Sequence, residues 1–203
     1  MSYVNIGMDS EQLMKYEKKF KACTIASERT ADEKVMANIF VALGLVDAPV
    51  EDAFDKYTRL VSTFIVCPVA LVSFVQEEQN RQYFKSQLGL DGKWATSRQT
   101  PLSHSFCQYV KRDNRPLIVE DAPSDARVCG NLAIPDLGVR AYLGVPIHAL
   151  NGMALGALCA IDVKPRIWHP SDLDVMLDLA ACVSDQIGLR ELRQGHRSHM
   201  EAA

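Results

Sequence analysis

The most constraining feature of the sequence is an Asn-Gly dipeptide, Asn151-Gly152, between two long apolar runs. Residues 139–150 precede it and residues 153–163 follow it, and both runs are rich in aliphatic side chains. Asn-Gly readily adopts the positive φ angles of a tight turn between antiparallel strands. The segment therefore predicts a β-hairpin, and with it an antiparallel sheet.

A second hairpin is predicted earlier in the chain. The apolar and β-branched run 69–75 and the run 81–86 flank a polar turn at residues 77–80, which is the pattern of two strands joined by a short loop. Between the hairpins we expect a loop from Gly89 to Thr100, a short helix through residues 101–110, a strand at 117–120 and an irregular segment at 121–138 with at most one or two helical turns.

Two amphipathic helices flank the predicted strands. Residues 54–65 carry a wide apolar stripe that ends before Pro68, and residues 170–187 begin with Pro170 and carry a second stripe. Two further helices are predicted near the N-terminus, the second ending at Gly44. The expected organisation is an N-terminal helical segment at residues 1–45, a globular domain at 46–195 and a C-terminal tail at 196–203.

These elements predict an α+β fold. Hairpins make an antiparallel sheet of five or six strands, and the two long helices need an apolar surface, which one face of that sheet supplies. Loops and short helices would cover the other face. This arrangement leaves room for a small-molecule cavity between the sheet and its irregular cover.

Composition excludes several classes of function. The formal net charge is −3, with acidic and basic residues interspersed, so we expect neither a nucleic-acid nor a membrane partner. The N-terminus lacks the build of a signal peptide, which predicts a cytoplasmic protein with six free thiols. No Cys-x-x-Cys pair is present, so no metal site is predicted and no cofactor is required. Cys67, Cys159 and Cys182 are expected to be buried small residues.

Five segments of the chain carry recognisable motifs, at residues 81–90, 100–109, 116–121, 138–147 and 156–162. In this order, and over roughly residues 50–192, the motifs resemble those of the GAF domain family. The resemblance implies an antiparallel sheet between helical layers, a role in signal transduction and frequent dimerisation through the terminal helices. It names no ligand, and we see neither a bilin-type Cys-His pair nor a cyclic-nucleotide signature. The motifs are RQYFKSQLGL (residues 81–90), TPLSHSFCQY (100–109), PLIVED (116–121), GVRAYLGVPI (138–147) and GALCAID (156–162).

Three functions follow as hypotheses. The first is a regulatory module that binds a small molecule and acts in trans, as a homodimer or on a signalling partner. Its ligand would lie between the sheet and the irregular cover. The candidate residues are Phe74, Phe84, Leu102, His104, Cys107, Val128, Tyr142 and Cys159.

The second hypothesis is an enzyme that resembles free methionine sulfoxide reductase, another GAF protein. Cys107 and Cys129 lie about where two of that family's cysteines lie, and such chemistry needs one attacking and one resolving thiol. Against it, residues 91–100 hold no cysteine, and Cys159 stands where the reductase has a carboxylate. The third hypothesis is a ligand-free dimerisation module.

Single residues outside these sets are expected to be structural. His104 would hydrogen-bond nearby backbone at a helix start, Asp162 would do so at a strand end, and Trp168 would pack beneath the last helix. Trp94, an aromatic residue in the predicted loop, could cover a cavity.

Overall fold

The computed structural model describes residues 39–201, with side chains described for residues 39–196. Most of the N-terminal segment therefore lies outside the described residues. The end of its second predicted helix is present, since residues 39–42 are helical and Gly44 follows with a φ of +63°. Phe40, Leu43 and Leu45 are buried in the core, so residues 40–45 pack with the globular domain.

One antiparallel sheet of six strands organises the chain, in the order β3-β2-β1-β6-β5-β4. Both predicted hairpins are confirmed as the pairs β1–β2 and β5–β6. The strands are β1 (Val69–Gln76), β2 (Arg81–Leu88), β3 (Gln99–Pro101), β4 (Leu117–Val119), β5 (Ala141–His148) and β6 (Ala154–Asp162). The predicted α+β fold and strand number are confirmed.

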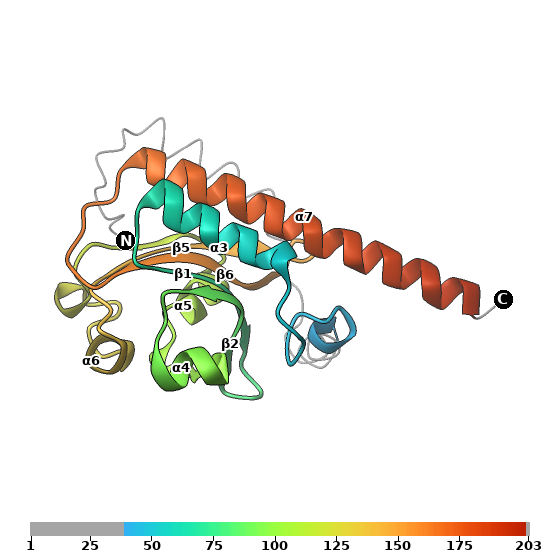
Figure 1. Ribbon diagram of the computed structural model, residues 1–203, viewed down its shortest axis with the longest axis horizontal. Helices are drawn as coiled ribbons and strands as arrows, with labels where there is room; N and C mark the ends of the chain where they lie inside the picture. Colours follow the sequence, from blue (N-terminus) through green and yellow to red (C-terminus); the bar gives the residue numbers. More distant parts are fainter. Residues whose placement is uncertain (1–38, 202–203) are drawn as a thin grey trace.

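Two long helices cover one face of the sheet, which we call the helix face. In Figure 1, α3 (Asp52–Ile65) and α7 (Pro170–Glu201) lie side by side across it. Each presents an apolar stripe to the strands, and burying a large aliphatic or aromatic side chain contributes about 1.5–3 kcal/mol. The buried residues of this layer include Phe54, Val61 and Ile65 of α3, Met176, Val183 and Ile187 of α7, and Trp168 before it.

Short elements cover the opposite face, which we call the roof face. They are α4 (Gly92–Ser97), η1 (Leu102–His104), α5 (Cys107–Asp113), η2 (Ala122–Ser124) and α6 (Ala133–Leu137). Figure 1 places α4, α5 and α6 across the sheet from α3 and α7. We use the term roof for η1, α5, η2 and α6 with their connections. The prediction of helices on one face and loops with short helices on the other is confirmed.

Four local predictions were wrong. The loop at 89–100 contains α4 and β3, and the helix at 101–110 is split into η1 and α5. The hairpin turn has a positive φ at Gly152 but not at Asn151, and the Gly152 N–H donates to the Ala149 carbonyl. The last helix continues through Glu201, into the predicted tail. Helix α7 thus runs on beyond Ile187, where its buried stripe ends, and Figure 1 shows these turns extending past the sheet.

A β-bulge places a lysine in the helix-face core. Val72 pairs with Ser86 and Ser73 pairs with Phe84, so Lys85 is the extra residue of β2. Both Lys85 and Ser86 consequently lie on the helix face, where the Ser86 hydroxyl donates to an Asp55 carboxylate oxygen at 2.6 Å. The Lys85 side chain is fully buried.

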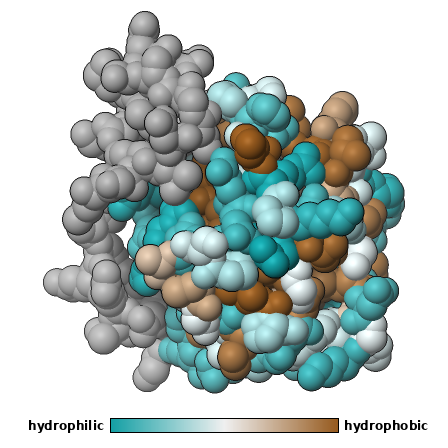
Figure 2. All heavy atoms as spheres, turned by 90° about the vertical axis from the view of Figure 1, so that its left-hand side faces the viewer, coloured by the Kyte–Doolittle hydropathy of each residue, from teal (hydrophilic) through white to brown (hydrophobic). Residues whose placement is uncertain are grey.

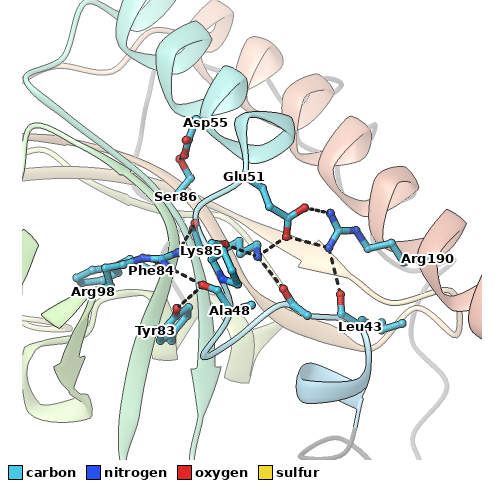
Figure 3. A network of polar contacts seen from close by, with 12 residues as sticks. Leu43, Ala48, Glu51, Asp55, Tyr83, Phe84, Lys85, Ser86, Arg98 and Arg190 are labelled. Atoms are coloured by element: carbon cyan, nitrogen blue, oxygen red, sulfur yellow. Dashed lines mark hydrogen bonds and ion pairs between the residues drawn. The ribbon is translucent and has the colours of Figure 1, made fainter. Parts of the chain in front are cut away.

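A carboxylate shared by two cations neutralises this buried lysine. Glu51 forms ion pairs with Lys85, at 2.5 Å, and with Arg190 of α7. The Lys85 ammonium also donates to the carbonyl of Gly44 at 2.7 Å, and Arg190 donates to the carbonyl of Leu43 at 3.1 Å. Figure 3 shows how this network, which we call the Glu51 network, joins β2, α7 and the chain segment before α3.

We expect Glu51→Gln to lower the free energy of unfolding by roughly 2 kcal/mol at neutral pH, because Lys85 would keep a buried charge without its carboxylate. Unfolding in urea measures the change. Asp52→Asn is the matched control, since Asp52 pairs with Arg59 at the surface, with side chains 85% and 54% exposed. That change should cost about 0.5 kcal/mol or less.

The same pair makes stability depend on pH. The hydrogen bond from Arg190 and the interaction with Lys85 lower the pKa of Glu51 from its usual 4.5 to about 2, although partial burial opposes them. Because the folded-state pKa is the lower one, the stabilisation is complete above pH 4.5 and is lost as the pH falls toward 2. The stability difference between the wild type and Glu51→Gln should therefore shrink on acidification; a constant difference would contradict this assignment.

Candidate functional site

The roof and the sheet enclose a small cavity, with an accessible volume of about 40 Å³. Strands β1, β2, β5 and β6 form its floor, and residues from η1, α5 and α6 form its cover. Its lining residues are mostly apolar: Val69, Leu71, Gln82, Phe84, Leu90, Thr100, His104, Phe106, Cys107, Ala133, Leu137, Val139, Tyr142, Ile161 and Val163.

Two polar groups in this lining have no hydrogen-bond partner. The Gln82 side-chain oxygen and the Thr100 hydroxyl are buried without one, and the two residues are cross-strand partners on β2 and β3. An unsatisfied buried polar group costs about 1–3 kcal/mol. Two such groups on one wall of a cavity are typical of a site that a hydrogen-bonding molecule completes.

Four of the eight predicted ligand-binding residues line this cavity, namely Phe84, His104, Cys107 and Tyr142. Val128 and Cys159 lie in the same roof-face core without reaching the cavity wall, and Leu102 packs against that core. These placements do not test whether any of the residues binds a ligand.

The placement of Phe74 in this group was wrong. Phe74 belongs to the helix-face core, where its ring centroid lies 5.6 Å from that of Phe40. Its cross-strand partner is Tyr83, whereas Phe84 pairs with Ser73, and directly paired residues share a face of the sheet. Phe74 and Phe84 therefore point in opposite directions.

A contact of His104 joins several elements on one side of the roof. The His104 ring lies in contact with the Asp136 carboxylate of α6, at 2.9 Å, and with the Ser103 hydroxyl, at 3.0 Å. The Trp94 ring of α4 packs on the same imidazole, with centroids 5.2 Å apart. His104 therefore joins η1, α4 and α6. The prediction that it hydrogen-bonds nearby backbone was wrong, because its ring contacts the side chains of Ser103 and Asp136 instead.

A glycine positions the tyrosine of the cavity. A Cβ atom on Gly144 would lie 2.2 Å from the Tyr142 hydroxyl, so only glycine leaves room for the phenol to lie along β5. The hydroxyl consequently reaches the Cys107 thiol of α5, at 3.1 Å. Burial raises the pKa of Tyr142 well above its usual value, so the phenol stays protonated.

The cysteines differ from one another in exposure. Cys67, Cys107 and Cys159 are buried, whereas Cys129 and Cys182 are exposed. Burial of Cys182 was therefore predicted wrongly, since it lies on the outer side of α7. Burial raises the pKa of Cys67 to about 11, which makes it an unreactive thiol.

Two further single-residue predictions, for Trp168 and Asp162, are confirmed. Trp168 is buried beneath α7 and donates its indole N–H to the Val119 carbonyl at 3.0 Å. Asp162 accepts the Lys164 N–H at the end of β6.

Within residues 39–196, no group of three or more His, Cys, Asp and Glu side chains is placed to hold a metal ion. In the same part of the chain, no helix is both long and apolar enough to cross a bilayer.

Comparison with known proteins decides the family. The GAF domain model matches residues 49–189. The chain belongs to the GAF domain family. Among curated proteins, it is similar to a cyclic di-GMP phosphodiesterase of Pseudomonas aeruginosa, with 33% identity over 125 residues, which is 61% of this chain and 20% of that enzyme. The matched part thus spans about a fifth of that relative.

Solved GAF structures share the fold. The GAF domain of an Acinetobacter phosphoenolpyruvate-protein phosphotransferase superposes with a TM-score of 0.58 at 17% identity, covering 84% of this chain and 99% of that one. A free methionine-R-sulfoxide reductase of Neisseria meningitidis, solved with its substrate, gives a TM-score of 0.55 at 14% identity, covering 83% and 95%. At such identities the likeness establishes the fold alone.

The two cysteines of the reductase hypothesis differ in environment. Cys107 is buried against the sheet, while Cys129 is exposed in the connection between η2 and α6. Cys159, at the position where the hypothesis needs a carboxylate, is a buried thiol 3.8 Å from Cys107. The geometry thus favours a contact between Cys107 and Cys159 over one between Cys107 and Cys129.

Sequence reasoning missed Gln82, Thr100 and Asp136. Gln82 lies two residues before Phe84 on β2, so the strand period of two places both side chains on the same face of the sheet. Its position beside the candidate Phe84 was therefore a signal that could have identified it. Thr100 lay at the end of the predicted loop, and its pairing with β2 became visible only in the sheet.

We expect Thr100→Val to raise the free energy of unfolding of the ligand-free protein by about 1 kcal/mol, because it removes an unsatisfied hydroxyl at constant volume. Thr58→Val is the matched control. Thr58 is equally buried, but its hydroxyl contacts Ser86 and donates to the Asp55 carbonyl, both at 2.9 Å. That variant should lose about 1 kcal/mol. Equal losses in both variants by urea unfolding would show that the Thr100 hydroxyl is already satisfied.

Proposed function

We propose that this GAF domain is a regulatory module of a signalling protein that binds a small molecule in the roof cavity. The observation that carries the proposal is the pair of unpartnered buried groups, Gln82 and Thr100, on the cavity wall. A ligand with an apolar body and one edge of hydrogen-bond donors fits this lining, since the Gln82 oxygen accepts and the remaining wall is apolar.

Binding of such a ligand requires the roof to move. The cavity measures about 40 Å³, whereas sites for drug-sized molecules measure roughly 300–1,000 Å³. On this side the Trp94 ring packs on His104, and His104 pairs with Asp136, whose carboxylate is half exposed. A ligand would therefore select a more open roof over the closed one.

Strand β2 offers a route from the cavity to α7. Phe84 faces the cavity, and the next residue, Lys85, enters the Glu51 network with Arg190. Arg98, which follows α4, donates to the backbone carbonyls of Phe84, Lys85 and Ala48. A displacement of β2 by a ligand would consequently change the packing of α7, the helix that extends from the domain.

Output in trans through a homodimer is part of the proposal. A groove of about 580 Å³ runs between α3 and α7 on their outer side, lined in part by Tyr57, Cys182 and Gln186. Leu189 and Leu192 are 55% and 56% exposed on the same helix. Apolar side chains at this spacing on a projecting helix are suited to helix pairing.

The relatives support a place in signalling. The curated relative is a cyclic di-GMP phosphodiesterase, and this chain matches a fifth of its length. We therefore propose a regulatory role without catalysis, toward a signalling partner. The five described cysteines are free thiols, which agrees with the reducing cytoplasm as its location.

A ligand that binds the folded state raises its melting temperature. We expect such a rise with at least one member of a panel of cyclic mononucleotides, cyclic di-GMP, free amino acids including methionine sulfoxide, and tetrapyrroles. The double variant Gln82→Leu, Thr100→Val should lose the rise, whereas Thr58→Val should retain it. If the double variant keeps the rise in melting temperature, the ligand binds elsewhere. If no compound of the panel raises the melting temperature, a ligand-free dimerisation module is favoured. Dithiol-dependent turnover of methionine sulfoxide would favour the enzyme.

Light scattering tests the dimer, because it measures the molar mass of the protein as it elutes from a size-exclusion column. We expect the wild type to have twice the chain mass, and the variant Leu189→Glu, Leu192→Glu to be a monomer, because like charges would meet across paired helices. Ile167→Glu is the control, since Ile167 is 71% exposed before α7 begins. A monomeric wild type at high concentration would contradict the homodimer.

A further inference from the structure

Two thiols face each other across the boundary between roof and sheet. The sulfur atoms of Cys107 on α5 and Cys159 on β6 are 3.8 Å apart, and both side chains are fully buried. The Tyr142 hydroxyl lies 3.1 Å from the Cys107 sulfur. Gly144 is the cross-strand partner of Cys159, so the absence of a side chain there gives Tyr142 access to this pair.

One of the two thiols is open to a small reactant. Cys107 lines the roof cavity, whereas Cys159 lies behind it. About 40 Å³ is enough for a molecule the size of one or two waters. The unpartnered oxygens of Gln82 and Thr100 in the same cavity can accept hydrogen bonds from the O–H groups of such a molecule.

The two thiols differ in acidity. Burial opposes ionisation of Cys107, but hydrogen bonds with Cys159, Ser73 and Tyr142 outweigh burial and lower its pKa. Burial raises the pKa of Cys159 well above its usual value. Because the thiolate is the nucleophile, Cys107 is the thiol that attacks first and Cys159 the one that resolves.

We propose that Cys107 and Cys159 form a reversible disulfide when the cavity admits a small hydroperoxide such as hydrogen peroxide. The Cys107 thiolate attacks one peroxide oxygen, the O–O bond breaks, and with one proton the other oxygen leaves as water, so that a sulfenic acid forms. The Cys159 thiol then attacks the Cys107 sulfur, its proton joins the departing hydroxide as water, and the S–S bond forms. Two thiols are oxidised by two electrons and one peroxide is reduced to two waters.

The bond would change the roof. A disulfide needs sulfur atoms about 2.05 Å apart, against 3.8 Å between the two thiols, and the bond would tie α5 to β6. In the oxidised domain the disulfide would hold the roof closed and so hinder ligand binding. This consequence rests on the proposed ligand site, but formation of the disulfide does not depend on that site.

The test is peptide mapping of the full chain. The reduced protein, with Cys129→Ser and Cys182→Ser to remove the two exposed thiols of the described residues, is treated with hydrogen peroxide, alkylated and digested without reductant. We expect a peptide pair linked through Cys107 and Cys159, two hydrogen atoms lighter than the sum of the reduced peptides, which dithiothreitol separates. Cys67→Ser in the same background should keep the link, because Cys67 packs on the helix face.

Two results would overturn the proposal. One is that Cys107 is oxidised irreversibly, or is linked to another cysteine, while Cys159 remains a free thiol. Iodoacetamide would then alkylate Cys159 after unfolding. The other is equal reactivity toward tert-butyl hydroperoxide, because a cavity of about 40 Å³ should admit that larger molecule more slowly than hydrogen peroxide. Both results are obtained without replacing Cys107 or Cys159, so neither depends on a variant that fails to fold.

Discussion

The structure depends on a sheet that is buried on both faces. Strand β1 is buried at each of its residues, and β5 and β6 are buried at all but their last. Such strands cannot face water, so the chain must supply two covers. Helices α3 and α7 form one, and a series of short elements forms the other.

The two covers differ in how well they can pack. A long helix presents a continuous apolar stripe, and α3 and α7 fill the helix face with large side chains such as Phe54 and Met176. The roof consists of helices of three to seven residues, each with at most two buried side chains. Short elements leave gaps, and the cavity with its unsatisfied groups lies in one of them. A protein departs from close packing and full hydrogen bonding where function requires it.

Polar contacts connect the two layers through β2. The bulge at Lys85 brings a charge into the helix-face core, while Phe84, one residue earlier, faces the cavity. Glu51 and Arg190 neutralise that charge and join β2 to α7 (Figure 3). Figure 2 shows the surface at one end of the molecule, where hydrophobic side chains lie in separate groups among hydrophilic ones. In the proposed function, the Glu51 network and α7 are the features through which a change at the cavity would reach another protein.

Local sequence determined the elements and their order. The two hairpins, helix α3 and the start of α7 at Pro170 follow from short-range patterns with the period of a strand or a helix. The family motifs were likewise visible in short stretches of sequence. Tertiary structure alone decided which side chains meet. The bulge at Lys85 turns Phe84 to the roof face, opposite to Phe74, and the antiparallel sheet brings Gln82 beside Thr100. Packing of the roof brings His104 to Asp136 and Cys107 to Cys159. These contacts join residues far apart in sequence, and a shift of one residue in register reverses the direction of every side chain on a strand.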